Sequence, residues 1–527
     1  MSRRIVFGVS ASWLRFVLVT LIGLLQTPLL FRYLPSAELG IWYLFFTIAT
    51  FLTLSDLGLP SAFSRAVSYI WGGSRGAAQD TTDAVPAFYR DVPLPDLYRS
   101  ALVASVGIAC VVALVGFPFA HAYLMMVTTD PLLQERILWA LLLFLGGVIG
   151  NLLAAIPNAC LSGMGDVGWD NASRTVMQLV GFVLIVLLLP RHPDIRLLAS
   201  IYLVQGMVSF IGGHLLVVWR HRLPILFGGR LNLPVVRRMY AESLPIMVTR
   251  LGVWLVLESN LMIAGYLLGA GKVPDFAALR QVVLMGMSIP TSIPIALAPY
   301  AAAAYSEGDL PKMRYYYRRA VRFSLLLAAL WAAGLLVWGP RVMELWLGPG
   351  HFVGYPVLIP LVLACFLELH HSSHCFFVWS AGRWPFMTSS MAAGALNLVL
   401  AFAGCHYYGF AGLAWGSMLA QLVTNNWYGV YYPLRHLGVA IADYLLRLFL
   451  PVLGYLALLL VGALALQRGI ERMLGLSTEG TVSRQLLFLD VGTGIVLTAA
   501  LALLLGWLLL SGEERQDLRG VLGRRGR

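Results

Sequence analysis

Long apolar stretches separated by short polar segments recur along the whole chain. A helix needs about 20 apolar residues to cross the hydrocarbon core of a bilayer. Stretches near this length repeat, and the run from Phe323 to Gly339 lacks the alternation of a membrane-barrel strand. Backbone groups in lipid must find their hydrogen-bond partners within the spanning structure. The pattern therefore predicts an all-α polytopic membrane protein.

About 14 transmembrane helices are predicted. They lie near residues 5–31, 40–60, 100–127, 137–160, 175–190, 197–218, 243–268, 277–300, 323–339, 355–380, 386–405, 410–432, 445–466 and 487–510. The first stretch is too long for a cleaved signal peptide, and Pro28 and Arg32 follow it instead of small residues. It is predicted to be the first span.

The composition agrees with a membrane protein and indicates its orientation. Only 12% of the residues are charged and the mean hydropathy is +0.79, whereas a soluble domain carries about 25% charged residues. Lys and Arg are retained on the cytoplasmic side, and most of the 37 fall in inner segments if the N-terminus is inside. Both termini are therefore predicted to be cytoplasmic. The net charge of +12 is attributed to this bias, not to nucleic-acid binding.

Two similar stretches predict an internal repeat. Residues Ser10 to Gly40 parallel residues Ile246 to Pro274, which places Arg15 and Arg250 at similar depths. The predicted organisation is a six-helix half (1–222), a second six-helix half (223–436), two additional transmembrane helices (437–511) and a basic cytoplasmic tail (512–527). Transporters with repeated halves bind substrate between them.

Several short motifs carry a family resemblance. They are the segment Leu24 to Ser68 with its Ser-Asp-Leu-Gly at 55–58, "LSGMGDVGWDNASR" at 161–174, "AYSEGDLPKMRYYYRRAVR" at 304–322 and "GLAWGSMLAQLVTNNWY" at 412–428. The chain resembles bacterial polysaccharide-export and O-antigen flippases of the multidrug/oligosaccharidyl-lipid/polysaccharide exporter superfamily.

The resemblance implies a location in the bacterial cytoplasmic (inner) membrane and a transport function. Undecaprenyl-pyrophosphate-linked oligosaccharide units would move from the inner to the outer leaflet for O-antigen or exopolysaccharide biosynthesis. The partners implied are the lipid-linked oligosaccharide, membrane lipid and polysaccharide assembly proteins.

Arg15 and Arg250 are the candidate pyrophosphate-binding residues. Charged groups in membrane spans are rare and usually functional, and a guanidinium can bind phosphate oxygens bidentately without losing its charge. Each could instead pair with a carboxylate to fix helix packing. Arg280 and Arg447 lie near the ends of their spans, where snorkelling explains them.

Carboxylates in the spans are candidates for proton or sodium coupling. Glu258 is predicted near mid-membrane, where burial disfavours its charged form; a salt bridge to an Arg is the alternative. Asp56 lies near the end of the second span and is expected to pair with a cation such as Arg65. Glu368 is the third candidate.

Three histidines follow Glu368 closely. His370 and His374 share a helical face, and His371 lies three residues after Glu368. Two histidines at this spacing can ligate zinc, but without a third ligand the pattern is weak, and no metal is predicted. Glycan binding, a proton relay and simple packing are the alternatives for His370, His371 and His374.

Other function classes fit the sequence less well. "GYLLGAGK" at 265–272 lacks the P-loop spacing, the five cysteines lack metal or redox spacing, and no cofactor is predicted. An ion-coupled multidrug antiporter should show mostly acidic residues in its spans. A polysaccharide polymerase or ligase should need a large outer loop with catalytic groups, so an enzyme is not predicted. A structural scaffold would not need buried charges.

Overall fold

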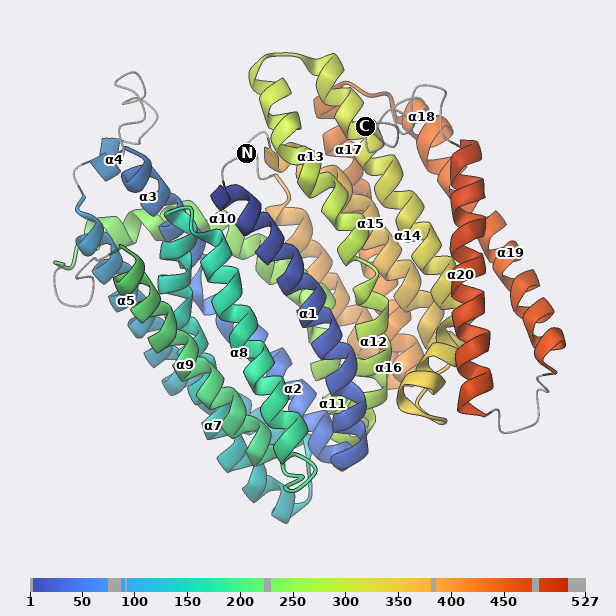
Figure 1. Cartoon of the computed structure of the whole chain (residues 1–527), viewed down its shortest axis with the longest axis horizontal. Helices are drawn as coiled ribbons and strands as arrows, with labels where there is room; N and C mark the ends of the chain where they lie inside the picture. The colour runs from blue at the N-terminus through green and yellow to red at the C-terminus, as the bar shows by residue number, and fades with distance from the viewer. Residues whose placement is uncertain are drawn as a thin grey trace. The chain divides into compact units, whose positions relative to one another are not determined.

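The computed structural model describes residues 3–73, 87–90, 92–221, 229–380, 385–475 and 483–509, and every regular element in these ranges is helical (Figure 1). The chain divides into two compact units, Met1–Pro274 and Asp275–Arg527. The predicted all-α fold is therefore confirmed. The predicted basic tail (512–527) lies outside the described residues.

The helices of the first unit follow the predicted spans with short additional turns. They are α1 (Arg3–Tyr33), α2 (Ser36–Thr53), η1 (Leu54–Asp56), α3 (Leu59–Gly73), α4 (Ala87–Arg90), α5 (Leu94–Val111), η3 (Val112–Gly116), α6 (Phe117–Val127), α7 (Pro131–Gly163), α8 (Val167–Leu188), α9 (Ile195–His221), α10 (Leu233–Leu257), α11 (Ser259–Leu268) and η4 (Ala270–Lys272).

The helices of the second unit continue in the same way. They are α12 (Val273–Met285), α13 (Ser288–Ser306), α14 (Leu310–Leu347), α15 (Tyr355–Ser380), α16 (Met387–Val423), α17 (Asn425–Leu437), α18 (Ile441–Tyr444), η5 (Leu445–Phe449), α19 (Leu450–Leu474) and α20 (Arg484–Leu509).

Thirteen described helices are long and apolar enough to cross a membrane, and the one from Met387 to Leu437 has 51 residues. At about 1.5 Å per residue that is far longer than one crossing needs. Gly409 breaks the helical conformation inside α16, with φ 59° and ψ −142°. The backbones of Gly404 and Gly412 then meet, which is the contact of an antiparallel hairpin. Counted as two crossings, this hairpin gives the fourteen that the hydrophobic pattern predicts.

Small residues hold the centre of the first unit together. The pairing of α7 with α9 is the most extensive in the molecule. A Cβ on Gly150 would lie 2.5 Å from the backbone of Gly206, and a Cβ on Gly206 would lie 2.3 Å from the carbonyl oxygen of Gly147. Close backbone approach at small residues is how membrane helices pack without a hydrophobic driving force. This rigid pair supports α8, which carries one wall of the cavity described below.

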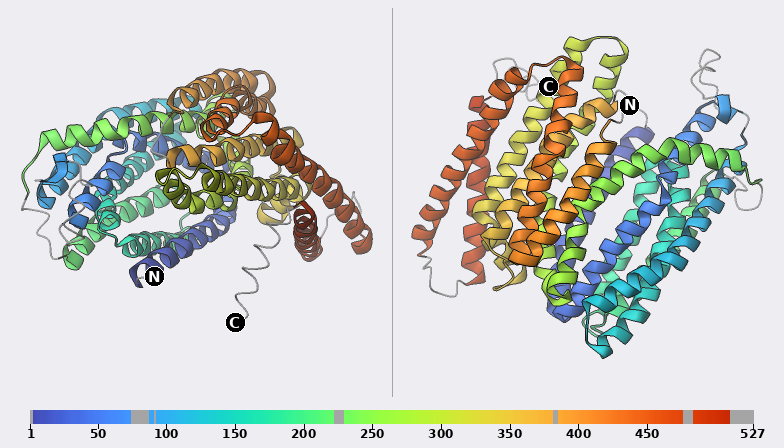
Figure 2. Two further views of the ribbon diagram at one scale, coloured as in Figure 1. Left: turned by 90° about the horizontal axis from the view of Figure 1, so that it is seen from above. Right: turned by 180° about the vertical axis from the view of Figure 1, so that it is seen from behind.

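In the second unit α19 and α20 lie beside α14 (Figures 1 and 2), and polar side chains join the three helices. Arg341 on α14 bonds Glu471 on α19 at 2.6 Å and also bonds Asp490 on α20. Trp338 Nε1 donates to Thr498 Oγ1 at 3.2 Å. Because a buried charge is costly unless paired, these bonds tie the two appended helices to this unit.

The compact units do not coincide with the predicted halves. The seventh span, formed by α10 and α11, packs on α2, α3 and α5 of the first unit, whereas the repeat pattern places it at the start of the second half. A sequence repeat and a packing unit are different properties, so the predicted boundaries at 222/223 and 436/437 stay predictions.

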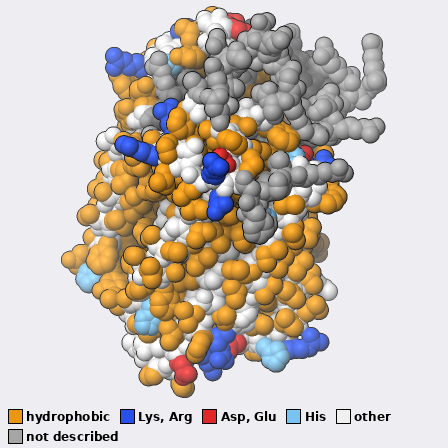
Figure 3. All heavy atoms as spheres, turned by 90° about the vertical axis from the view of Figure 1, so that its left-hand side faces the viewer, with side chains coloured by type: hydrophobic (Ala, Val, Ile, Leu, Met, Phe, Trp, Pro, Cys, Tyr) orange, Lys and Arg blue, Asp and Glu red, His pale blue; other side chains and the backbone are white. Residues whose placement is uncertain are grey.

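A hydrophobic band covers the middle of the face drawn in Figure 3, and most charged side chains gather above and below it. Exposed leucines and valines on α8, α9, α19 and α20 are part of the surface of their units, among them Leu187, Leu215, Val461 and Leu503 at 52–77% exposure. Together with the thirteen long apolar helices, this makes the chain a multi-pass integral membrane protein.

Candidate functional site

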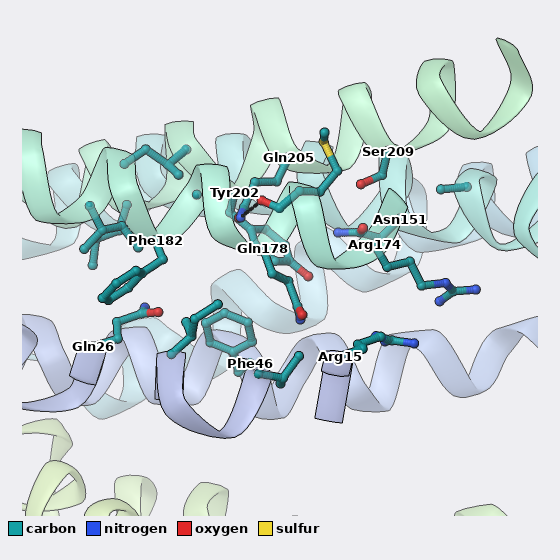
Figure 4. Close-up of a pocket in the computed structure, with 18 of the residues that line it drawn as sticks. Arg15, Gln26, Phe46, Asn151, Arg174, Gln178, Phe182, Tyr202, Gln205 and Ser209 are labelled. Atoms are coloured by element: carbon teal, nitrogen blue, oxygen red, sulfur yellow. Dashed lines mark hydrogen bonds between the residues drawn. The ribbon is translucent and has the colours of Figure 1, made fainter. Parts of the chain in front are cut away.

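A polar cavity of about 420 Å³ lies inside the first unit, between α1, α2, α7, α8 and α9 (Figure 4). Ligand pockets typically measure about 300–1,000 Å³. Its lining combines apolar residues with cationic, amide, hydroxyl and aromatic side chains, namely Arg15, Gln26, Trp42, Phe46, Asn151, Asn158, Arg174, Gln178, Phe182, Tyr202, Gln205 and Ser209. So many polar groups facing a cavity within membrane helices mark a functional site.

Two guanidinium groups lie at one end of the cavity. Arg15 on α1 and Arg174 on α8 lie near each other there, whereas Gln26 and Phe182 lie at the other end (Figure 4). Arg15 Nη1 donates to Asn171 Oδ1 at 3.1 Å, and Asn171 Nδ2 donates to Ser12 Oγ at 2.9 Å. The charge of Arg174 acts directly on Arg15. Two like charges held this close favour an anionic ligand between them.

The side chain of Arg174 is held by a carboxylate on its own helix, α8. Its Nε donates to Asp170 Oδ1 at 2.7 Å, and Ser162 Oγ donates to Asp170 Oδ2 at 2.9 Å. Only one of the three guanidinium nitrogens is used by Asp170, so the terminal nitrogens remain for a ligand. A guanidinium held in place by a carboxylate is pre-oriented for planar phosphate recognition.

Sequence reasoning missed Arg174. The predicted fifth span starts at residue 175, directly after Arg174. In the structure α8 begins at Val167, so Arg174 lies two turns inside the helix. The signal was present in the spacing of Asp170 and Arg174, which places a carboxylate and a guanidinium on neighbouring turns of one helix face.

The rest of the cavity offers amides and aromatic rings. Gln205 Nε2 donates to the carbonyl oxygen of Met177 at 3.0 Å, whereas Gln178 Oε1 is buried and has no hydrogen-bond partner among the described residues. Tyr202 stacks on Phe144 with ring centroids 4.6 Å apart. Amides can donate to and accept from hydroxyl groups, and aromatic faces suit the apolar faces of sugar rings. This wall can hold an uncharged, hydroxyl-rich group.

Arg250 lies elsewhere in the same unit. It is on α10, which packs against α3 and η1, and it is not among the residues lining the cavity. Its charge acts on Asp56, at the end of η1, where Asp56 Oδ1 accepts from the backbone N–H of Gly58 at 2.7 Å. Arg250 is thus one cation that acts on Asp56, and the pairing of Asp56 with Arg65 that the sequence suggests stays a prediction. The structure does not bring Arg250 into the cavity with Arg15, and the pyrophosphate role predicted for Arg250 stays a prediction.

Glu258 sits at a break in the seventh span. It ends α10 and precedes α11, with φ −101° and ψ −30°, and its N–H bonds the carbonyl oxygen of Trp254 at 2.8 Å. A carboxylate at an interrupted helix is typical of ion sites in transporters. Its coupling role stays a prediction.

The second unit contains a buried chain of hydrogen bonds that joins two of the predicted histidines. His370 Nδ1 bonds Asn426 Oδ1 at 2.9 Å, and its Nε2 bonds Tyr444 Oη at 2.5 Å. His374 Nε2 bonds the same Tyr444 Oη at 3.1 Å, and its Nδ1 bonds Tyr317 Oη at 2.6 Å. All five side chains are buried.

This chain has a consistent direction when both imidazoles are neutral. If His370 Nδ1–H donates to Asn426, its Nε2 accepts from Tyr444, whose oxygen accepts from His374 Nε2–H. His374 Nδ1 then accepts from Tyr317. Every ring nitrogen has a partner, so both imidazoles are satisfied without any charge, whereas Asn426 Nδ2 is buried without a hydrogen-bond partner among the described residues. A proton added at His370 Nε2 would force the Tyr444 hydroxyl to turn, and one added at His374 Nδ1 would force the Tyr317 hydroxyl to turn. Sequence reasoning did not single out three members of this chain, because they lie on helices that are distant in the sequence from His370 and His374. They are Tyr317, Asn426 and Tyr444.

His371 and Glu368 form a separate pair. His371 Nε2 lies 3.6 Å from Glu368 Oε1, and its Nδ1 lies 3.1 Å from the carbonyl oxygen of Leu367. The four residues of this segment therefore divide into two groups on different sides of α15. Within the described parts of the chain, no group of three or more His, Cys, Asp or Glu side chains could hold a metal ion.

The fold is that of a polytopic membrane protein whose first unit encloses a cavity lined by two arginines, several amides and aromatic rings. Residues 6–304 match the family described as "Polysaccharide biosynthesis protein". The match covers more than half of the chain, and the protein belongs to this family. The sequence resemblance is thereby confirmed.

One curated relative is the "Uncharacterized membrane protein EpsK" of Bacillus subtilis (strain 168). It is 29% identical over 201 residues, which are 36% of this chain and 38% of that protein. The aligned part therefore spans well under half of the relative.

Two solved structures share the fold. The lipid II flippase MurJ in an inward closed conformation has a TM-score of 0.65 at 13% identity, over 94% of this chain and 98% of that one. An inward-facing multidrug resistance MATE family transporter of the MOP superfamily has a TM-score of 0.64 at 15% identity, over 80% and 94%.

Proposed function

We propose that the protein is a flippase of undecaprenyl-pyrophosphate-linked oligosaccharide repeat units. It moves them from the inner to the outer leaflet of the bacterial cytoplasmic membrane, for O-antigen or exopolysaccharide biosynthesis. The observation that carries the proposal is the cavity of the first unit, where Arg15 and Arg174 adjoin a wall of amides and aromatic rings. Membership in the polysaccharide biosynthesis family supports it.

The cavity supplies what such a headgroup needs in order to cross. A diphosphate and a glycan are costly to place in hydrocarbon. Arg15 and Arg174 neutralise the diphosphate, and the amides of Gln178, Gln205 and Asn151 replace the water that the sugar hydroxyls lose. The site binds and moves its ligand without making or breaking a covalent bond.

Energy would come from a proton or sodium gradient, or from consumption of the flipped product outside by polysaccharide assembly proteins. Asp56, Glu258, Glu368 and the buried chain of His370 and His374 are the proposed coupling groups. His371, paired with Glu368, is the candidate for contact with glycan or for passing a proton to that carboxylate.

Surface glycan per molecule of membrane-inserted protein tests the proposal. In a strain lacking the gene, we expect Arg15→Ala to lower export roughly tenfold to a hundredfold, because a hydrogen bond to a charged group contributes about 1.5–3 kcal/mol. Export by Arg15→Lys should fall between that of Arg15→Ala and that of the wild type. Lys keeps the charge but cannot bind two phosphate oxygens at once as the planar guanidinium does. Arg196→Ala is the matched control, because Arg196 pairs with Asp194 near the start of α9. Normal export by Arg15→Ala would overturn the site.

A multidrug antiporter is the second candidate, and the likeness to a MATE transporter favours it. An antiporter for cationic drugs needs an anionic cavity. The only carboxylate tied to the described cavity, Asp170, is already engaged by Arg174 and Ser162. Drug resistance conferred by the protein in a sensitive host, without any change in surface glycan, would favour the antiporter.

A further inference from the structure

A second cavity of about 340 Å³ lies between α8 and α9, and it is mostly apolar. We call it the α8–α9 groove. Its lining includes Trp169, Arg174 and Val176 on α8, Val208 and Gly212 on α9, and Asn158 on α7.

The groove adjoins the polar cavity. The two share Asn158, Arg174, Met177 and Ser209. Arg174 therefore belongs to both, at the boundary between a space lined by cations and amides and a space lined by aliphatic groups. A ligand that touches Arg174 can reach into either one.

The outer rim of the groove faces apolar surroundings. Val176 is 50% exposed and Val208 is 42% exposed, and a Cβ on Gly212 would meet nothing within 4 Å. In a membrane protein, exposed aliphatic side chains contact lipid tails. The groove thus connects the hydrocarbon of the bilayer with the guanidinium of Arg174.

One end of the groove is closed by a fixed cluster. Trp169 meets Trp219 edge to face at 6.1 Å, and the guanidinium of Arg220 lies 5.7 Å from the Trp169 ring. Arg220 Nε also bonds Asp166 at 3.3 Å. These contacts join α8 to α9 at this end and leave the glycine-lined part between them open.

We propose that the α8–α9 groove holds the hydrocarbon chain of the lipid whose phosphate is bound by Arg15 and Arg174. This rests on the proposed function. The ligand class is a single-chain isoprenoid diphosphate. A groove of about 340 Å³ has room for part of one chain, and two adjacent guanidiniums suit a diphosphate, which carries more charge than a phosphodiester. A membrane phospholipid has two acyl chains and one phosphodiester charge, so it matches both features less well.

Filling the groove tests the proposal. Gly212→Leu adds an isobutyl group where the structure has open space, and Leu also favours a helix more than Gly does. Gly107→Leu on α5 is the matched control, because Gly107 is also exposed and its Cβ would also meet nothing within 4 Å. Purified full-length protein in detergent would be titrated with undecaprenyl diphosphate and with the short, water-soluble isopentenyl diphosphate, by native mass spectrometry.

We expect Gly212→Leu to weaken undecaprenyl diphosphate binding roughly tenfold, since burial of only two CH₂ groups contributes more than that factor. Isopentenyl diphosphate binding should not change, and Gly107→Leu should match the wild type with both probes. Arg174→Ala should weaken both probes.

Each contrary result has one meaning. Undecaprenyl diphosphate binding that survives Gly212→Leu but not Arg174→Ala would overturn the groove and leave the proposed function standing. Binding of both probes that survives Arg174→Ala would overturn the phosphate site itself. Equal weakening by Gly107→Leu, or equal competition by phosphatidylglycerol, would also overturn the groove as a site for this lipid.

Discussion

Arg174 and Asn171 show how neighbouring residues on α8 define the charged end of the cavity. Asn171 holds Arg15 at 3.1 Å, and Asp170 holds Arg174 at 2.7 Å. Each guanidinium is positioned by a fixed partner on α8, so the two groups can act on one ligand. Arg250 lies instead beside Asp56.

Double substitutions distinguish these two arrangements. If Arg15 and Arg174 bind one diphosphate, the double Ala variant should export much more than the product of the single effects predicts, because residues that serve one ligand are not additive. If Arg250 pairs with Asp56 and does not bind the diphosphate, the effects of Arg15→Ala and Arg250→Ala on export should multiply in the double variant. Surface glycan per inserted molecule is the measurement. A strongly non-multiplicative Arg15/Arg250 pair would restore Arg250 to the pyrophosphate site.

A structural role for Arg250 has its own signature. Removing the cation beside Asp56 leaves a partly buried carboxylate without its opposite charge, which is strongly destabilising. We expect Arg250→Ala to lower the amount of protein in the membrane and Asp56→Asn to restore it in the double variant. Quantitative immunoblots of membrane fractions measure this. An Arg250→Ala protein at full abundance would argue against the pairing.

Tyr444 is the centre of the buried histidine chain, since its hydroxyl contacts both His370 and His374. Tyr444→Phe should leave two buried ring nitrogens without partners, at a cost of about 1–3 kcal/mol each. We expect a lower thermal midpoint for the purified protein. Tyr428→Phe, in the cavity that His370 and Tyr444 also line, should leave the midpoint unchanged. If the chain also carries protons, export by Tyr444→Phe should lose the pH dependence of the wild type; unchanged pH dependence would remove the relay.

At the scale of single helices, the hydrophobic pattern predicted which segments cross the membrane but not where they end. The fifth span was predicted from residue 175 and the ninth at 323–339, whereas α8 begins at Val167 and α14 runs from Leu310 to Leu347. In both cases charged residues lie inside the helix. Their partners come from other helices or from the facing turn, and a hydropathy window does not detect them.

The same limit applies to the site. Arg15 and His370 could be singled out because charged and titratable groups in spans are rare. Tyr444 and Asn426 could not, because their importance depends on contacts with His370 and His374, far away in the chain. For Arg174 the only local signal is its spacing from Asp170. The lining of the polar cavity comes from five helices. A single sequence does not show which residues of different helices lie opposite one another.

The α16 hairpin leaves no room for a larger side chain where its two arms meet. A Cβ on Gly412 would lie 1.9 Å from the carbonyl oxygen of Gly404, so a larger side chain must push the two arms apart. We expect Gly412→Leu to destabilise the protein by about 1–3 kcal/mol or more. Gly454→Leu on α19, where a Cβ would meet nothing within 4 Å, should have little effect. Equal thermal midpoints for the two variants would mean that the arms do not meet as described.

At the scale of the whole molecule, an ion-pair network in the second unit determines whether the number of crossings between its members is even or odd. Arg341 near the end of the ninth span bonds Glu471 near the end of α19 and Asp490 near the start of α20. These three residues must therefore lie on one side of the membrane. An even number of crossings must separate Arg341 from Glu471. The spans between them are α15, the segment from Met387 to Leu437, and the segment from Ile441 to Leu474. The count is even only if the middle segment crosses twice.

Reporter fusions test this parity directly. With fourteen crossings, a reporter at Glu471 follows thirteen spans and one at Asp130 follows three, so both should report the side opposite to the N-terminus. A reporter at Arg230 follows six spans and should report the same side as the N-terminus, which the distribution of Lys and Arg predicts to be the cytoplasm. If the 51-residue segment crossed only once, Glu471 would report the same side as Arg230, and its bond to Arg341 could not form. Opposite signals from Arg230 and Glu471 are therefore the expected result, and matching signals would overturn both the hairpin and the predicted cytoplasmic C-terminus.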